Sequence, residues 1–207
     1  MENLVTRKRW DRTSKSFDLM NSYGRDKRWE EPKRQFFSTM NGKILYLAAG
    51  TGLDFKFFPP FKNIIGIDIS PKMLEKAAKK ATAYSGSITL LERDVTDLDF
   101  PDDSFDQVFT SCTFCSFPNP IKGLKELKRV LKPDGVLRMF EHTSSRYFPF
   151  NLMLHLMTPV TRIIGTDMNR DTESNVRKAG FVIKEINNYF LDVVKSIYAV
   201  LPKPINE

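Results

Sequence analysis

The sequence predicts an α/β fold, in which a seven-stranded and mostly parallel sheet carries helices on both faces and includes an antiparallel strand near the C-terminus. Short apolar segments bounded by glycine, proline or aspartate recur along the chain, as is typical of buried parallel strands. Segments with helix-capping residues lie between them, and this alternation indicates βαβ units. The last two strand-like segments are joined by a short connection, so they can pair antiparallel.

Each element has its own signal in the sequence. The strand-like segments are residues 44–48, 63–68, 88–92, 105–110, 136–141, 181–187 and 193–200. The helical segments are residues 14–21, 26–40, 71–83, 119–131 and 172–179. Ser70 and Pro71 predict a helix start, because serine caps helices and proline favours the first helical position. Thr172 is the expected N-cap of the last helix, and Gly180 is its expected C′ residue.

The composition along the chain indicates an N-terminal helical cap, residues 1–41, and a ligand-binding domain, residues 42–207. Basic residues around Trp10 predict that the cap includes an arm that contacts a membrane, and a solvated, partly disordered arm is the alternative. An apolar insert, residues 147–165, interrupts the second part without strand character. We expect this insert either to pack as a helix on the core or to provide a second apolar surface.

The composition also excludes several classes of protein. The 207 residues are 41% hydrophobic, which allows a core of ordinary size. Two cysteines exclude a disulfide scaffold and indicate a reducing compartment. Neither a signal-peptide-like start nor a run of about 18 apolar residues is present, so we expect a cytoplasmic protein. The net charge of +7 favours an acidic partner such as an anionic membrane surface, and without a recognisable module we expect no nucleic acid.

A glycine-rich turn follows the first strand. Gly50 and Gly52 come directly after the apolar run 44–48. Glycine lets the backbone approach a ligand closely, and amides at a following helix N-terminus bind polar or anionic groups. Any tight turn between a strand and a helix also favours glycine, so this motif alone leaves both interpretations open.

Polar or small residues follow the next three strands. Asp68 ends the second strand, where a carboxylate can accept both ribose hydroxyls of an adenosine cofactor. Asp94 and Val95 follow the third strand, and Ser111 follows the fourth. These positions share the carboxyl edge of a parallel sheet and together predict one nucleoside-cofactor site. The alternatives are a helix-capping role for Asp68 and a solvated turn for Asp94.

Two cysteines lie in the segment after the fourth strand. Cys112 and Cys115 form a C-x-x-C motif, but no second pair of cysteines and no histidine cluster accompanies it. We therefore expect buried thiols in a packed turn and no bound metal.

These motifs together resemble the class I S-adenosylmethionine-dependent methyltransferases, which implies a Rossmann-like sheet. The matching segments are residues 45–52, 66–74, 94–95, 105–108 and 129–136. The chain is most similar to three groups: the quinone C-methyltransferases, the bacterial phospholipid N-methyltransferases and the membrane-associated thiol methyltransferases. The segments 10–12 and 140–142 support this branch. The chain departs from the family at Tyr46, where an acidic residue is usual, and at Ala48, where glycine is usual.

The resemblance implies S-adenosyl-L-methionine as the cofactor. The implied cofactor-binding residues are Ala48, Gly50, Gly52, Asp68, Ile69, Met73, Asp94, Val95 and Ser111. The candidates beside the acceptor are Tyr23, His142 and Glu141; simple packing is the alternative for Tyr23, and pairing with neighbouring strand-end groups is the alternative for Glu141 and His142.

The resemblance further implies a lipophilic acceptor reached at a membrane surface, on the inner face of the membrane. The first expectation is a phosphatidylethanolamine-type headgroup amine, and the alternatives are a thiol or a quinol, or a soluble acceptor with the insert as a lid. A nicotinamide oxidoreductase would need a third glycine, but Asp54 and Phe55 stand in that region. A cofactor-binding protein without activity is a further alternative.

Overall fold

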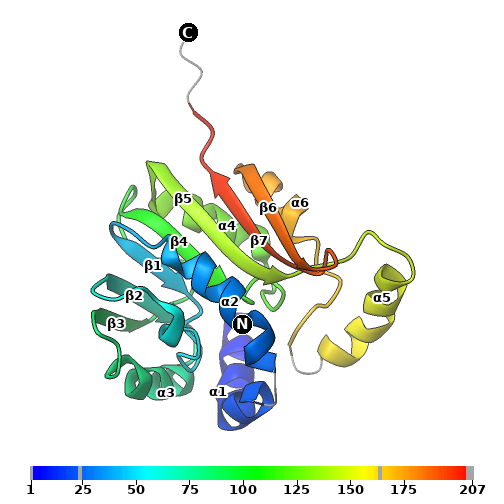
Figure 1. Cartoon of the computed structure of the whole chain (residues 1–207), viewed down its shortest axis with the longest axis horizontal. Helices are drawn as coiled ribbons and strands as arrows, with labels where there is room; N and C mark the ends of the chain where they lie inside the picture. The colour runs from blue at the N-terminus through cyan, green and yellow to red at the C-terminus, as the bar shows by residue number, and fades with distance from the viewer. Residues whose placement is uncertain (1, 23–24, 163–164, 204–207) are drawn as a thin grey trace. The chain divides into compact units, whose positions relative to one another are not determined.

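Parallel strands with a helix between them form the first of two units, Met1–Asp94 and Val95–Glu207, of the computed structural model (Figure 1). The structure describes residues 2–22, 25–162 and 165–203. In the first unit the strands β1 (Ile44–Leu47), β2 (Asn63–Asp68) and β3 (Ser87–Glu92) run parallel in the order β3-β2-β1. Every residue of β1 is buried, as its unbroken apolar sequence predicts.

Helix α3 (Pro71–Ala81) connects β2 to β3. The Ser70 hydroxyl accepts a hydrogen bond from the Met73 amide at 3.1 Å, and Pro71 occupies the first turn, so the predicted cap is confirmed. The short 3₁₀ turn η1 (Phe55–Phe57) follows the glycine-rich loop. These local signals place the carboxyl ends of β1 and β2 beside the start of α3.

The N-terminal region contains α1 (Glu2–Ser22) and α2 (Arg25–Ser38). The helix expected over residues 14–21 is present but longer than predicted, because α1 begins at Glu2 and runs for 21 residues. The alternative of a partly disordered arm is wrong for this part of the chain, since α1 packs on α3. Ion pairs between Arg7 and Glu92 at 2.7 Å and between Lys80 and Asp18 at 2.8 Å accompany this packing.

In the second unit the strands β4 (Phe105–Ser111), β5 (Leu131–His142), β6 (Val182–Phe190) and β7 (Val194–Val200) have the order β4-β5-β7-β6. Strands β4 and β5 are parallel, whereas β7 runs antiparallel to both of its neighbours. The expected C-terminal antiparallel pair is confirmed. The chain therefore has the Rossmann-like fold that the sequence predicts, with seven strands that are mostly parallel.

Helices α4 (Pro120–Val130) and α6 (Thr172–Lys178) pack on each other and on β5 and β6, respectively. The predicted N-cap of α6 is wrong by one residue, because the Asp171 carboxylate accepts from the Ser174 amide at 3.0 Å. Thr172 is instead buried. Strand β5 begins at Leu131, earlier than predicted, and its register with β4 shifts between Phe105 and Gln107.

The apolar insert forms helix α5 (Phe150–Thr161), which stands apart from the strands of its own unit (Figure 1). Only Leu154 and Thr158 of this helix are buried, so the expectation that the insert packs wholly on the core is wrong. Within the described residues, no helix combines the length and the apolar character needed to cross a membrane.

Candidate cofactor-binding and active site

The loop after β1 has the backbone conformation of a close-approach turn. Ala48, Gly50 and Gly52 have φ angles of 52°, 55° and 77°, the left-handed region that favours glycine. A Cβ atom on Gly52 would lie 2.8 Å from the Phe55 ring and 3.2 Å from the Ala77 Cα atom, so no larger residue fits there. Ala48 adopts the same region with a side chain, and this conformation costs about 1–2 kcal/mol.

Asp68 organises this loop from the end of β2. Its carboxylate accepts the Gly50 amide and the Ser70 amide, each at 2.8 Å. Burial raises the pKa of Asp68 to about 6, although these hydrogen bonds favour the ionised form. Each carboxylate oxygen has lone pairs beyond these bonds, so ionised Asp68 can accept further hydrogen bonds from a ligand.

The remaining candidates in the first unit lie close to Asp68 in the chain. Ile69 follows it and is half-buried, whereas Met73 is buried in the first turn of α3. Asp94 is half-buried just beyond β3. The Arg93 amide donates to the Asp68 backbone carbonyl at 3.0 Å, which fixes the chain leading to Asp94 against the end of β2.

Two carboxylates of α1 contact this region, and the sequence interpretation did not assign them a contact. Asp11 accepts from the Ser70 hydroxyl at 2.6 Å, and Asp18 accepts from the Thr51 hydroxyl. Burial opposes the ionisation of Asp18, but Lys80 and Thr51 outweigh it and lower its pKa. Residues 11 and 18 are two helical turns apart, so their side chains lie on one face of the helix. This spacing is the feature of the sequence that could have predicted that both contact the same region.

Tyr46, where the family usually has an acidic residue, belongs to the core of the first unit. Its ring packs edge-on against Phe37 and Phe58, with centroid distances of 5.9 and 5.0 Å. Its hydroxyl donates to Asp54 at 2.9 Å, and Lys33 contacts the other oxygen of Asp54 at 2.6 Å. A carboxylate therefore lies at the tip of the Tyr46 side chain.

In the second unit, Ser111 and His142 lie at the carboxyl ends of β4 and β5. Ser111 is paired in register with Phe140, so His142, two residues further along, has its side chain on the same face of the sheet. Ser111 Oγ and His142 Nδ1 are buried and have no hydrogen-bond partner among the described residues. Such atoms cost about 1–3 kcal/mol each while they stay unpaired, so Ser111 and His142 are candidates for contact with a ligand. Arg138, Arg170 and Thr172 of the same unit also have a buried side-chain atom with no partner among the described residues.

Burial lowers the pKa of His142 below its usual value of 6.5, because desolvation disfavours the charged imidazolium. The ring is therefore neutral at pH 7. A neutral imidazole can accept a proton from a ligand. Tyr23, the other residue expected beside the acceptor, lies outside the described residues.

Glu141 directly precedes His142 on β5, so its side chain lies on the opposite face of the sheet. Its buried carboxylate accepts from the Thr110 hydroxyl at 2.7 Å and from the Thr113 and Phe114 amides at 2.9 and 3.1 Å. Burial raises the pKa of Glu141 to about 7. Glu141 is therefore a positioning residue for the loop after β4, which is the alternative expected from sequence, pairing with neighbouring strand-end groups.

The cysteines of that loop differ from the expectation. Cys115 is buried, and burial raises the pKa of its thiol well above the usual value, so it is unreactive. Cys112 is exposed, which contradicts the expected burial of both thiols. Its φ angle of 52° turns the chain outward directly after β4. Val95, at the start of this unit, is buried and lies beside Gly123 of α4.

Comparisons with known proteins agree with this geometry. A family model described as a methyltransferase domain matches residues 45–139. A demethylmenaquinone methyltransferase from Symbiobacterium thermophilum is 29% identical over 205 residues, 93% of this chain and 82% of that protein. The human thiol S-methyltransferase TMT1B is 30% identical over 172 residues, 75% of this chain and 70% of that protein. The chain belongs to the S-adenosylmethionine-dependent methyltransferases.

The fold of this methyltransferase is also found in solved structures. A SAM-dependent methyltransferase from Aquifex aeolicus superimposes with a TM-score of 0.67 at 18% identity, covering 90% of this chain and 97% of that one. The predicted family, enzyme class and cofactor are thus confirmed. The residues fit the cofactor: Asp68 retains acceptor capacity for ribose hydroxyls, and the backbone at Gly50 is open, because a Cβ atom there would have the Ala48 carbonyl oxygen, at 3.8 Å, as its nearest neighbour.

Proposed function

We propose that this methyltransferase transfers a methyl group to a lipophilic quinol or thiol, and that His142 accepts the proton which the acceptor must lose. The observation that carries the proposal is the pair of buried, unpartnered atoms Ser111 Oγ and His142 Nδ1 on one face of β4 and β5. We assign the cofactor to the residues around Asp68 and the acceptor to this pair, so Ser111 takes a role at the acceptor in place of the cofactor contact expected from sequence.

The cofactor supplies a methyl group on a sulfonium, which is electrophilic without further activation. The chain must therefore hold the acceptor in line with that methyl group and exclude water, and positioning of this kind can lower a barrier by about 7–11 kcal/mol. Ionised Asp68 would accept hydrogen bonds from the ribose hydroxyls, and the turn at Gly50 and Gly52 would bind polar groups of the cofactor.

His142 acts on the acceptor. A thiol has a pKa of about 8.5 and a phenolic hydroxyl about 10, so both are protonated at neutral pH and attack poorly. Neutral His142 accepts that proton, which leaves the acceptor as a thiolate or a phenolate able to react with the electrophilic methyl group that a bound cofactor would supply. Ser111 orients the acceptor by a hydrogen bond.

Two features support a lipophilic acceptor. The relatives described above are named for demethylmenaquinone and for thiols, and helix α5, in the same unit as Ser111 and His142, exposes apolar side chains. Neither relative is named for a phospholipid, so we place phosphatidylethanolamine, the first expectation from sequence, behind the quinol and the thiol. Because lipophilic acceptors dissolve in bilayers, the proposed enzyme works at a membrane surface on the cytoplasmic side.

The test is methyl transfer from labelled S-adenosylmethionine to three acceptors side by side: a short-chain naphthoquinol, an alkyl thiol and phosphatidylethanolamine vesicles. We expect methylation of the quinol or the thiol. Transfer to phosphatidylethanolamine alone, or transfer to none of the three, would overturn the proposed acceptor class. The family membership of the chain would stand in either case.

A further inference from the structure

Helix α5 has the opposite surface pattern from an ordinary helix of a globular protein. None of its 12 residues is charged. Its narrow buried stripe contains Leu154 and Thr158, while its apolar face, defined here as Leu152, Met153, Leu156, Met157 and Val160, is exposed. Leu156 and Val160 are 70% and 68% exposed. A helix that is apolar around most of its surface is usually buried, so this one lacks its apolar environment in the isolated chain.

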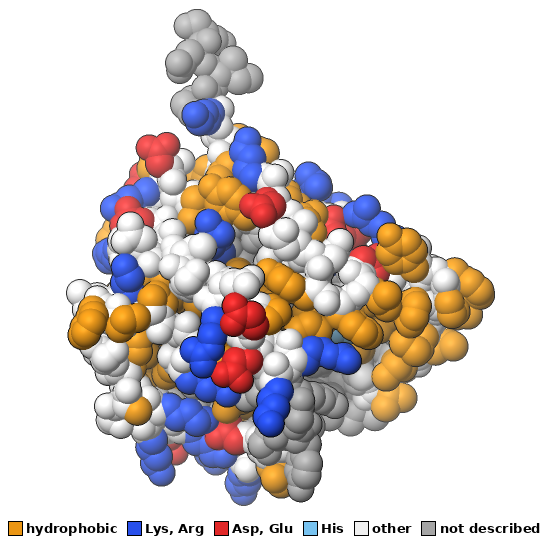
Figure 2. Space-filling model, viewed as in Figure 1, with side chains coloured by type: hydrophobic (Ala, Val, Ile, Leu, Met, Phe, Trp, Pro, Cys, Tyr) orange, Lys and Arg blue, Asp and Glu red, His pale blue; other side chains and the backbone are white. Residues whose placement is uncertain are grey.

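The apolar face continues beyond the helix. Phe148, directly before α5, is 78% exposed, and Tyr147 is also exposed. Figure 2 shows hydrophobic side chains gathered over this end of the second unit. A contiguous exposed apolar patch of this kind marks an interaction site.

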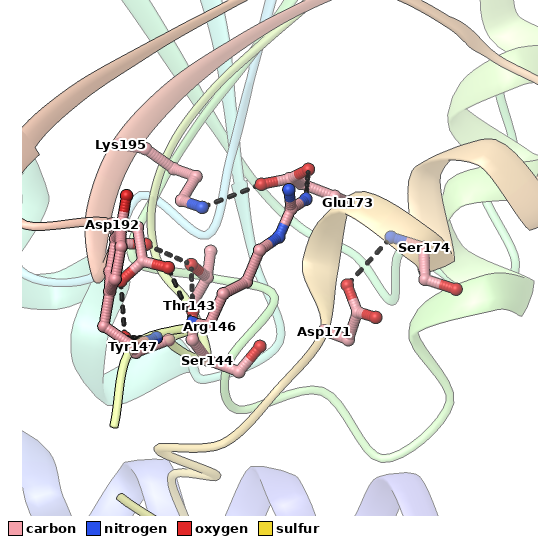
Figure 3. A network of polar contacts seen from close by, with 10 residues as sticks. Thr143, Ser144, Arg146, Tyr147, Asp171, Glu173, Ser174, Asp192 and Lys195 are labelled. Atoms are coloured by element: carbon pink, nitrogen blue, oxygen red, sulfur yellow. Dashed lines mark hydrogen bonds and ion pairs between the residues drawn. The ribbon is translucent and has the colours of Figure 1, made fainter. Parts of the chain in front are cut away.

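The root of α5 is fixed by a polar network (Figure 3). Asp192 accepts the Ser145 hydroxyl at 2.5 Å and the Arg146 amide at 2.6 Å. The Arg146 guanidinium reaches Glu173 at 2.8 Å, and Glu173 also binds buried Lys195 at 2.7 Å. The apolar face is therefore presented from a structured base on β7 and α6.

The shape of the patch does not suit a small ligand or a second copy of the chain. A groove of about 430 Å³ is lined by Pro149, Leu152, Met153, Leu156, Met157, Val160 and Thr161. All of these residues belong to α5 or directly precede it, so the groove has a wall on one side only. A pocket for a small ligand instead encloses most of the ligand's surface. A stable dimer needs about 20–30 residues on each side, far more than this single helix presents.

The charges around the patch suit an anionic bilayer. Arg146 lies just before the helix and Arg162 just after it, and their side chains remain 79% and 64% exposed although each has one carboxylate partner. The whole chain has a net charge of +7. Aromatic residues and arginines at the ends of an apolar segment suit a membrane interface, where aromatic rings and long cationic side chains lie at the level of the headgroups.

We propose that α5 is a membrane-docking helix, and that its apolar face inserts into the surface of an anionic bilayer with Arg146 and Arg162 at the lipid headgroups. The helix is about 18 Å long, so it lies in one leaflet and does not cross. This inference deepens the proposed function by naming the element that brings the enzyme to its acceptor, and it rests on that function only for the presence of a membrane.

The test is cosedimentation of the full chain with vesicles of phosphatidylcholine and phosphatidylglycerol at 70:30, without cofactor or acceptor. The test variant is Leu156→Asn with Val160→Asn, and the matched control is Phe61→Asn, which changes an aromatic side chain that is 82% exposed in the first unit. We expect the double variant to bind at least about 10-fold more weakly and the control to bind like the unchanged chain. Thermal melts check that all three fold alike.

Several results would overturn the proposal. These are no binding by the unchanged chain, equal binding by the double variant, or equal binding to vesicles of phosphatidylcholine alone. Self-association in the absence of vesicles that the double variant abolishes would instead assign the face to a second copy. Because no methyl transfer is measured, these results are independent of the acceptor assay.

The variant Leu19→Asn in α1 distinguishes docking through α5 from docking through the N-terminal arm. Leu19 is 62% exposed, and the sequence predicts a membrane contact for this arm. If α5 is the docking element, Leu19→Asn leaves vesicle binding unchanged. A loss of binding in Leu19→Asn as large as that in the α5 double variant would contradict the assignment to α5.

Discussion

The turn at Asp68 and helix α5 differ in what they bury: the turn buries a polar group, whereas α5 exposes apolar side chains. At the Asp68 turn, a buried carboxylate is bonded to two backbone amides, so each polar group is held in place within the first unit. On α5, apolar side chains face outward and only the root is bonded. The Asp68 turn has its polar groups hydrogen-bonded and needs only its ligand. The exposed apolar side chains of α5 are shielded from water only if another apolar surface covers them.

Because of this difference, substitutions in the two regions should affect different properties of the enzyme. Variants at the strand ends should alter chemistry or cofactor affinity and leave vesicle binding intact. Variants on the apolar face should do the reverse.

His142→Gln removes the proposed proton acceptor while keeping a polar side chain on β5. We expect kcat on a soluble alkyl thiol to fall by about 10²–10⁴-fold, the usual range for a general base. His155→Gln is the matched control, since His155 is exposed on α5. In the unchanged enzyme, the rate should fall on the acidic side only below pH 6.5, because burial lowers the pKa of His142. Equal rates in the two variants would show that His142 is not the base.

Asp68→Ala removes the acceptor for the ribose hydroxyls and also frees the Gly50 and Ser70 amides. We expect the affinity for S-adenosylhomocysteine to fall by about 10- to 150-fold, because a hydrogen bond to a charged group contributes about 1.5–3 kcal/mol. Calorimetry measures this directly, with Asp97→Ala as the control because Asp97 is exposed. Unchanged affinity in Asp68→Ala would rule out the assignment.

Glu141→Gln keeps the shape and hydrogen bonds of a buried side chain but removes its titration. The folded-state pKa of Glu141 is about 7, above its usual value of 4.5, so the folded state binds the proton more tightly. Its contribution to stability is therefore fully present below pH 4.5 and is lost as the pH rises through 7.

Between pH 5 and 8, the free energy of unfolding of the unchanged chain should thus fall relative to Glu141→Gln, by on the order of 2 kcal/mol. Urea titrations of both proteins at the two pH values measure the difference. Asp68 titrates in both proteins, so its contribution cancels. Parallel pH profiles would show that the raised pKa of Glu141 is wrong.

Ala48→Gly should produce the smallest effect, and it should be stabilising. The φ angle of 52° is strained for alanine, whereas glycine adopts it freely. After the extra entropy of glycine in the unfolded state, we expect a gain of about 0.5–1 kcal/mol in the free energy of unfolding. Ala49→Gly, one residue further along without a positive φ angle, should instead lose stability. A loss of stability in both variants would contradict the strain at Ala48.

The sequence predicted what local rules decide. Strand β2 and the Ser70 cap follow from apolar runs and capping chemistry, and the order of the strand-end residues follows from the parallel topology. The contacts of Asp11 and Asp18 depend on how α1 docks, which no local pattern states. The sequence left two possibilities for α5 open, packing on the core or forming a second apolar surface, because an apolar helix has the same sequence pattern whether it is buried or exposed.

The fixed root of α5 has a consequence for orientation. A helix joined through a flexible linker would let the enzyme tumble at the bilayer, but Ser145 and Arg146 are clamped to Asp192 and Glu173. With α5 lying in the interface, the second unit would keep a nearly constant tilt to the membrane normal and rotate only about that normal. The carboxyl ends of β4 and β5 would then meet every acceptor from one direction. Polarised infrared or spin-label measurements on oriented bilayers would register this as narrow angular order.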